Sequence, residues 1–181
     1  QTLDDAVGEA FDKAARILGL GYPGGPAIEK IAKGANLTEK MPRAWLPGTL
    51  DFSFSGVKTA LLNRARSLKV YPEQDKYLDE SVIPDLASAF QEAVVDVISK
   101  KAAEACEMTG AKGLILGGGV SANSRLREEC INRTTVPVLV PAPKLCTDNG
   151  AMIAAAAFHR LNMNSEEVPL NFDTNPSLVM A

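Results

Sequence analysis

Histidine is almost absent from this 181-residue sequence, which contains a single copy, His159. One histidine excludes an HExxH motif, a histidine-cysteine metal cluster and any triad that draws on two histidines, so this chain cannot assemble zinc protease chemistry alone. Cysteine is also scarce: Cys106, Cys130 and Cys146 are far apart, form no C-x-x-C pair and are odd in number. They suit small buried thiols in a reducing, cytosolic compartment better than a disulfide framework.

Net positive charge and long apolar runs are missing as well. The formal net charge is −3, so the chain as a whole has no electrostatic attraction to nucleic acid, and RNA binding would have to be local or supplied by partners. No run approaches the roughly 18 apolar residues that cross a bilayer, and we expect no membrane association. The chain begins with Gln1 rather than Met, which we interpret as an excised piece or a lost beginning.

The sequence has the composition of a globular protein, since 46% of its residues are hydrophobic and 23% are charged. We therefore expect one globular core, or one lobe of a larger protein. Apolar spacing predicts helices at the following places: residues 4 to 18, with Asp4 and Asp5 at the N-terminus; "AIEKIAKGA"; from Gly56 to about Leu68; Ser81 to Cys106, with Pro84 in the first turn; residues 121 to 132; and "TDNGAMIAAAAFHRL". These helices would enclose a single core.

Three segments read as strands. "DFSFSG" at 51 to 56 alternates polar and aromatic residues, while "KGLILGG" and "PVLVPAP" read as buried strands. Few strands and many helices predict an α/β layer whose sheet is incomplete. We expect one domain over residues 1 to 161 and a polar tail over 162 to 181.

The most distinctive stretch is "LILGGGVSANSRLRE", residues 114 to 128. Gly117, Gly118 and Gly119 can adopt positive φ and allow another molecule to approach the backbone, and the helix that follows offers unpaired N–H groups. One interpretation is a pocket for a phosphate-bearing or nucleotide-like ligand. The other is a tight strand-to-helix turn.

Acidic residues near glycines give further candidates. Asp12 and Glu29 flank the glycine-rich segment that contains Gly25, where a carboxylate could accept from ribose hydroxyls, although Asp12 alone is more typical of a solvated helix surface. Thr147 and Asp148 precede a helix, so either could cap it, and Asp148 could instead bind a metal ion. Lys58 is a phosphate contact or an ordinary surface lysine.

The order and spacing of five segments resemble the TsaD family, formerly labelled O-sialoglycoprotein endopeptidases or glycoproteases. The segments are "TLDDAVGEAFDKAARILGLGYPGGPAIEK", "DFSFSGVKTA", "SAFQEAVVDV", "GGGVSANSRLRE" and "CTDNGAMIA". The resemblance spans about residues 2 to 158. The resemblance implies the second half of a two-lobed, actin-like ATPase fold built from RNase H-like units. It also implies transfer of a threonylcarbamoyl group from threonylcarbamoyl-AMP to N6 of adenosine 37 in tRNAs that read ANN codons.

Site residues carried over from the family are one metal ligand, Asp148, and a set of substrate contacts. The substrate contacts are Asp12, Gly25, Glu29, Gly118, Gly119 and Asn123. The resemblance further implies one iron or zinc ion, whose two histidine ligands and an accompanying phosphate loop belong to a first lobe that this sequence lacks. The ion would polarise the carbamoyl carbonyl for attack by the tRNA amine, and no residue of this chain is expected to act as a nucleophile.

The implied partners are tRNA, the first lobe, other subunits of threonylcarbamoyladenosine synthesis and a possible second copy. The implied location is the cytoplasm, or the mitochondrial matrix for an organellar paralogue. Two other classes of function stay open: an actin-like ATPase or kinase-type nucleotide-binding module, and a non-catalytic assembly scaffold that presents the helix over residues 81 to 106.

Overall fold

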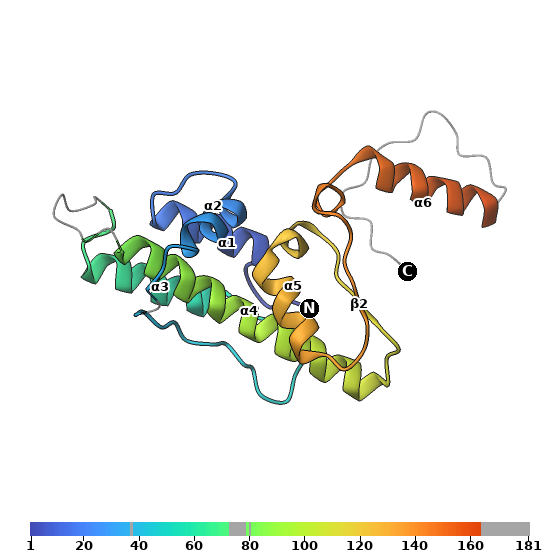
Figure 1. Cartoon of the computed structure of the whole chain (residues 1–181), viewed down its shortest axis with the longest axis horizontal. Helices are drawn as coiled ribbons and strands as arrows, with labels where there is room; N and C mark the ends of the chain where they lie inside the picture. The colour runs from blue at the N-terminus through green and yellow to red at the C-terminus, as the bar shows by residue number, and fades with distance from the viewer. Residues whose placement is uncertain (37, 73–78, 80, 164–181) are drawn as a thin grey trace. The chain divides into compact units, whose positions relative to one another are not determined.

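The computed structural model describes residues 1–36, 38–72, 79 and 81–163. The chain divides into two units, residues 1–147 and 148–181, which are described separately (Figure 1). The first unit contains α1 (Val7–Ile17), α2 (Gly24–Ala32), α3 (Ser55–Ser67), α4 (Val82–Thr109), β1 (Leu114–Ile115), the 3-10 turn η1 (Gly119–Ala122), α5 (Ser124–Arg133), β2 (Val138–Leu139) and the 3-10 turn η2 (Pro143–Leu145). The second contains α6 (Gly150–Met163).

The long helix α4 organises the first unit. It contacts α1, α2, α3 and α5, and the side chains between these helices form the main core. At its centre Phe11 of α1 meets Phe90 of α4 edge to face, with ring centroids 5.3 Å apart, a favoured geometry for aromatic pairs. The helix predicted from Ser81 to Cys106 is therefore confirmed and extends three residues further.

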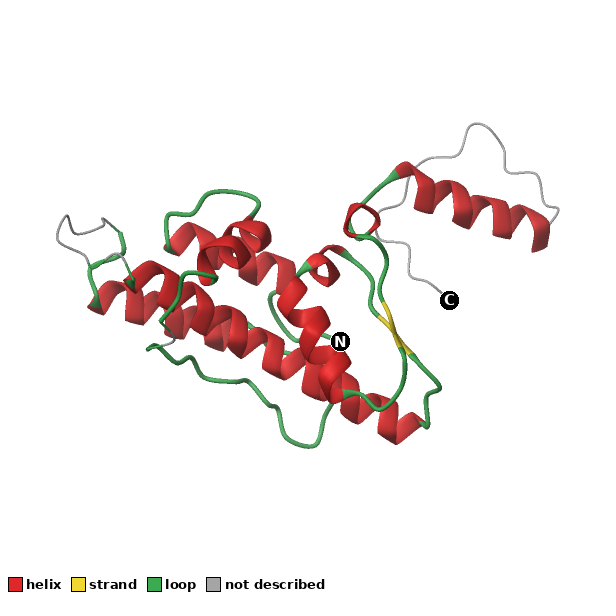
Figure 2. Ribbon diagram, viewed as in Figure 1, coloured by secondary structure: helices red, strands yellow, loops and turns green. Residues whose placement is uncertain are grey.

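Strands are confined to one short parallel pair in the described part of the chain, as Figure 2 shows. Leu114 pairs with Val138 and Ile115 with Leu139. Leu114 and Val138 pack against a small cluster that joins α4 and α5, whereas Ile115 and Leu139 are 76% and 60% exposed. Both strands were predicted to be buried, and this is wrong for the face that carries Ile115 and Leu139. The helices cover only the opposite face of the sheet. The fold is helix-rich with a small parallel sheet, compatible with the expected α/β class.

The strand predicted over residues 51 to 56 is also wrong. Only Phe52 forms a bridge, to Thr2, and the helix α3 already begins at Ser55. The cause is Asp4, whose carboxylate accepts from the backbone N–H groups of Phe54 (2.8 Å) and Ser55 (3.3 Å). A side chain distant in sequence therefore caps α3 and turns this segment into a helix start.

The predicted role of Asp4 and Asp5 at the start of α1 is wrong for the same reason. The N-cap of α1 is Ala6, which offers no side-chain hydrogen bond. Asp5 instead pairs with Lys13 at 2.7 Å and with Lys58 at 2.5 Å. Lys58 is therefore engaged in an ion pair, and the structure gives it no place at a ligand pocket.

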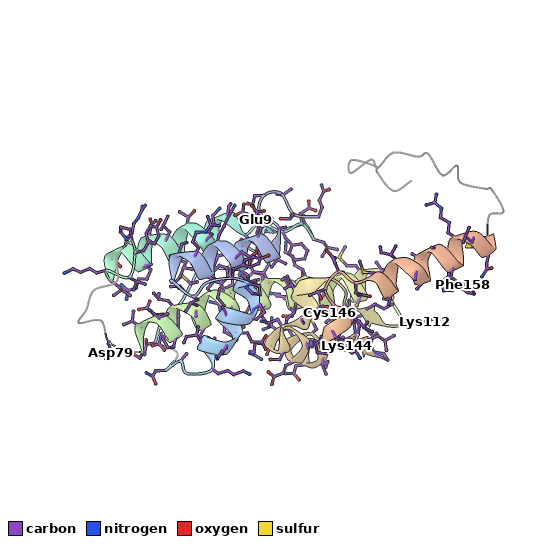
Figure 3. All side chains as sticks on the ribbon, turned by 90° about the horizontal axis from the view of Figure 1, so that it is seen from above. Glu9, Asp79, Lys112, Lys144, Cys146 and Phe158 are labelled. Carbon is purple, nitrogen blue, oxygen red and sulfur yellow. The ribbon has the colours of Figure 1, made fainter. Side chains whose placement is uncertain are left out.

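The second unit contains α6, and no residue of this helix is buried. Ile153 and Phe158 are 63% and 64% exposed, and Figure 3 shows Phe158 projecting from this helix. Asn149 caps α6 by accepting from the Met152 N–H at 3.0 Å, so the cap predicted at Thr147 or Asp148 is wrong. Most of the predicted tail, residues 164 to 181, lies outside the described residues. No described helix has both the length and the apolar content to cross a membrane.

Candidate functional site

A cavity of about 470 Å³ lies in the first unit, within the size range of small-ligand pockets. It is bounded by α1, the start of α2, η1 and the residue that precedes α5. Its lining residues are Gly8, Phe11, Asp12, Pro23, Gly25, Pro26, Glu29, Gly119, Val120, Ala122, Asn123 and Thr147. Five of the seven site residues predicted from the sequence therefore lie together. Gly118 and Asp148 are not in the lining.

Asp12 fixes the wall where α1 meets α2. One of its carboxylate oxygens accepts from the Gly24 N–H at 2.7 Å, which supplies α2 with a cap from another helix. Glycine is required at this contact, since a Cβ on Gly24 would lie 2.5 Å from the Asp12 Cα. This cap also explains why α2 begins at Gly24, three residues before the predicted start.

Gly25 occupies the next position of α2 and faces open space. An added Cβ would meet nothing within 4 Å, and the residue lines the cavity. A ligand can therefore approach the backbone here without meeting a side chain. Gly24 and Gly25 thus serve different purposes, close helix packing and ligand access.

Glu29 joins α2 to the start of α5. Its Oε1 accepts from the Ser124 N–H at 3.1 Å and from the Ser124 hydroxyl. Leu126 donates its N–H to the Asn123 side chain at 2.9 Å. The expectation that this helix start offers unpaired N–H groups is therefore wrong for Ser124 and Leu126, which have acceptors within the protein.

Asn123 is both a lining residue and the N-cap of α5. It is only 7% exposed, and its side-chain amide also donates to Gln91 Oε1 at 2.9 Å. The preceding glycines make the turn that brings it there: Gly118 has φ of +82°, a conformation that favours glycine. The structure therefore combines the two interpretations of this stretch, a tight turn and a cavity wall.

The chemistry of the lining suits a neutral nucleoside better than a phosphate. Asp12 and Glu29 each use one oxygen within the protein, which leaves a second oxygen to accept from sugar hydroxyls. Phe11, Val120 and the two prolines offer apolar surface for a base. Among the described lining residues there is no Lys, Arg or His, so a phosphate would find no cation here.

A metal site needs several donor side chains within reach of one ion. No group of three or more His, Cys, Asp or Glu residues that could hold an ion occurs among the described residues. Asp148 is exposed, and the single histidine, His159, lies on α6 eleven positions later. The side chains that the structure describes therefore do not fit a complete metal site.

Sequence reasoning missed several lining residues, above all Phe11, Val120 and Thr147. Phe11 and Val120 carry no chemical motif, and only the contact of α1 with η1 brings them to one cavity. Thr147 was considered only as a helix cap. Its position next to the "CTDN" motif was the one available signal.

Comparison with known proteins identifies the family. Residues 1–155 match the family described as "TsaD: tRNA N6-adenosine threonylcarbamoyltransferase". This chain belongs to the TsaD family. The resemblance seen in the sequence motifs is thereby confirmed, and the TsaD match includes every predicted site residue from Asp12 to Asp148.

Relatives named tRNA N6-adenosine threonylcarbamoyltransferase extend the TsaD match to nearly the whole chain. The protein from Thermomicrobium roseum is 47% identical over 98% of this chain and 52% of its own length. The protein from Dehalococcoides mccartyi strain BAV1 is 43% identical over 98% of this chain and 51% of its length. The protein from Desulfitobacterium hafniense strain Y51 is 47% identical over all of this chain and 52% of its length. The chain spans about half the length of these curated relatives.

Proposed function

We propose that this chain is the nucleoside-binding half of an enzyme that transfers a threonylcarbamoyl group from threonylcarbamoyl-AMP to N6 of adenosine in tRNA. The observation that carries the proposal is the cavity that joins Asp12, Gly25, Glu29 and Asn123. Family membership supplies the reaction. We further propose an actin-like lobe over residues 1 to 161, followed by a tail.

Each lining group has a role in holding the adenosine portion. The second oxygen of Asp12 and that of Glu29 accept from the ribose hydroxyls, while the ribose lies against the bare backbone of Gly25 and Gly119. Asn123 donates an N–H to the base, and Phe11 provides an apolar wall. These contacts hold the adenylate so that its reactive carbonyl faces the tRNA amine, and positioning of this kind lowers the barrier to transfer.

The phosphate and the metal are not held by this cavity. The absence of a basic side chain among the described lining residues supports a phosphate that extends away from it. We propose Asp148 as the single ligand that this chain contributes to an iron or zinc ion, the other ligands coming from outside the chain. tRNA, further synthesis subunits and a second copy remain the proposed partners, in the cytoplasm.

A titration of the chain with AMP, ATP and a non-hydrolysable threonylcarbamoyl-adenylate mimic tests this function. Preference for the mimic over ATP supports the transferase. Preference for ATP together with ATP turnover would favour an ATPase or kinase-type module. Absence of binding by all three to the folded chain would favour an assembly scaffold.

A further inference from the structure

Gln91 is a polar side chain in the apolar interior of α4. It is 6% exposed, and its neighbours Phe90, Ala93 and Val94 are buried in the core. A buried amide is costly unless it is hydrogen-bonded. The bond that it makes is to Asn123, 32 positions later, whose Nδ2 donates to Gln91 Oε1 at 2.9 Å.

Asn123 has two hydrogen-bond partners that hold its amide in one orientation. Asn123 Oδ1 accepts from the Leu126 N–H at 2.9 Å, while Nδ2 donates to Gln91. If the amide turned over, its NH₂ would face the N–H of Leu126, and its oxygen would face the oxygen of Gln91. The contact with the Leu126 N–H would then be repulsive whichever way the Gln91 amide faces, so Leu126 selects this orientation and the bond to Gln91 holds the nitrogen in place.

One N–H of Asn123 Nδ2 remains for a ligand, because an amide nitrogen carries two and Gln91 takes one. Asn123 lines the cavity, and it is the one described lining residue with a side-chain N–H. The other polar side chains there include the carboxylates of Asp12 and Glu29, which only accept. The orientation of this amide therefore sets the hydrogen-bonding character of that wall.

We propose that Gln91 is a positioning residue of the pocket: it holds Asn123 so that a single N–H donor faces the ligand, and it thereby selects a ligand with an acceptor atom at that wall, such as a purine ring nitrogen. The inference rests on the proposed function for the nature of the ligand. Gln91 itself is absent from the lining and acts through Asn123.

Three variants separate positioning from general destabilisation. Gln91→Leu removes the acceptor, while Gln91→Glu keeps an acceptor oxygen and replaces the NH₂ group with a second oxygen, which makes the side chain an ionisable carboxyl. Ser99→Ala is the matched control, because Ser99 is a fully buried polar residue of α4 whose hydroxyl donates to Val95 O at 2.7 Å. Ser99 does not line the pocket.

Two measurements on the full chain are made for each variant: AMP affinity by calorimetric titration, and solvent exchange of the Asn123 side-chain amide by NMR. Gln91→Leu is expected to weaken AMP binding about tenfold and to accelerate exchange by a similar factor. For Gln91→Glu, we expect the AMP affinity and the amide exchange rate to stay within about threefold of the parent values. For Ser99→Ala, we expect both quantities to equal those of the parent protein.

Parent-like affinity and exchange in Gln91→Leu would overturn the proposal, as would an equal loss in Ser99→Ala. Failure of the parent chain to bind AMP would count against the proposed nucleoside site. In that case the exchange measurement still decides whether Gln91 positions Asn123, because it needs no ligand.

Discussion

At the residue scale, Asp12 both caps α2 and lines the cavity. One oxygen accepts from the Gly24 N–H at 2.7 Å, and the other is available to a ligand in the cavity. Asp12→Asn retains an oxygen for Gly24 but replaces the second acceptor with an NH₂ donor. We expect AMP affinity to fall by about 10- to 100-fold, the cost of an unpaired polar group, with little change in stability.

Calorimetric titration and thermal unfolding of the same sample check this expectation. Asp12→Ala is the informative companion, because it removes both oxygens and should lower both affinity and stability. Unchanged AMP affinity in Asp12→Asn would mean that the carboxylate serves only to cap α2.

Gly24 and Gly25 provide a matched pair of substitutions one residue apart. A Cβ on Gly24 would lie 2.5 Å from the Asp12 Cα and 2.6 Å from the Phe11 carbonyl oxygen. Gly24→Ala should therefore destabilise the protein by about 2 kcal/mol through overpacking. Gly25→Ala meets no atom within 4 Å, so its stability should stay level or rise by about 0.5 kcal/mol, while AMP affinity falls because the methyl group enters the cavity.

Chemical denaturation of both variants, with AMP titration of Gly25→Ala, measures these effects. Equal stability of the two alanine variants would contradict the close packing of α2 on α1. Unimpaired AMP binding by Gly25→Ala would show that the ligand does not approach this backbone.

The sequence indicated the lining residues better than their partners. Glycine-rich spacing and the family resemblance were enough to select five lining residues: Asp12, Gly25, Glu29, Gly119 and Asn123. Their hydrogen-bond partners could not, because Glu29 contacts a residue 95 positions away and Asn123 one 32 positions away. No local pattern encodes such contacts.

At the element scale, Asp4 stabilises the start of α3 and has a measurable pH signature. Burial raises the pKa of Asp4, but the hydroxyls of Ser53 and Ser55 and the N–H groups of Phe54 and Ser55 lower it to about 2. A folded-state pKa below the ordinary value of 3.8 means that the contribution to stability is present above about pH 4 and is lost as the pH falls toward 2.

Asp4→Ala should therefore lower the free energy of unfolding by about 1 kcal/mol at pH 7, a typical cost for losing a helix cap. The difference in the free energy of unfolding between Asp4→Ala and the parent protein should narrow as the pH falls from about 4 toward 2. Urea denaturation at several pH values provides the measurement. Glu9→Ala is the control: its carboxylate makes only an exposed pair with Lys13, so a change within about 0.5 kcal/mol is expected. A pH-independent difference for Asp4→Ala would count against the cap.

Asp96 of α4 joins two further elements. It accepts from Arg43 Nε at 2.9 Å and also pairs with Arg133 of α5. Burial raises the pKa of Asp96, but the two guanidinium groups outweigh this and lower it. Asp96→Ala should destabilise the protein by about 1 to 3 kcal/mol, because the partly buried Arg43 loses its ion pair and Arg133 keeps only its pair with Glu129. Denaturation at pH 7 tests this, and an effect no larger than that of Glu9→Ala would contradict it.

Helices were predictable at this scale because apolar spacing is a local property. α1, α3, α4 and α5 were all anticipated within a few residues of their bounds. The segment from 51 to 56 was not, since its alternation of polar and aromatic residues is typical of a strand. Asp4 caps α3 and so makes this segment a helix start. Asp4 is about 50 positions away in the sequence, so this contact exists only in the folded structure.

At the scale of the whole molecule, the first unit has an apolar core, whereas the described residues do not form a metal site. The buried cluster around Phe11 and Phe90 should give cooperative unfolding of the first unit. No described group of side chains can hold a metal ion by itself. We therefore expect the purified chain to retain well below one iron or zinc ion after gel filtration, and to transfer no threonylcarbamoyl group to unmodified tRNA.

Metal analysis and mass spectrometry of tRNA nucleosides check this expectation. Adding the missing half of the relatives' length should restore both properties, and Asp148→Ala in that complete protein should reduce them together. Stoichiometric metal or modified adenosine produced by this chain alone would require an active site that the described residues do not show.

We infer that the cavity beside α1, α2 and η1 binds the nucleoside part of an adenylate. The most direct measurement is NMR chemical-shift mapping of the isotope-labelled chain during titration with adenosine, AMP and ATP. We predict that adenosine and AMP both shift the backbone amides of Gly25, Val120 and Asn123, because the cavity would recognise the nucleoside and its described lining offers no cation to a phosphate. Shifts at these residues with ATP but not with adenosine, or no shifts there at millimolar adenosine, would contradict it.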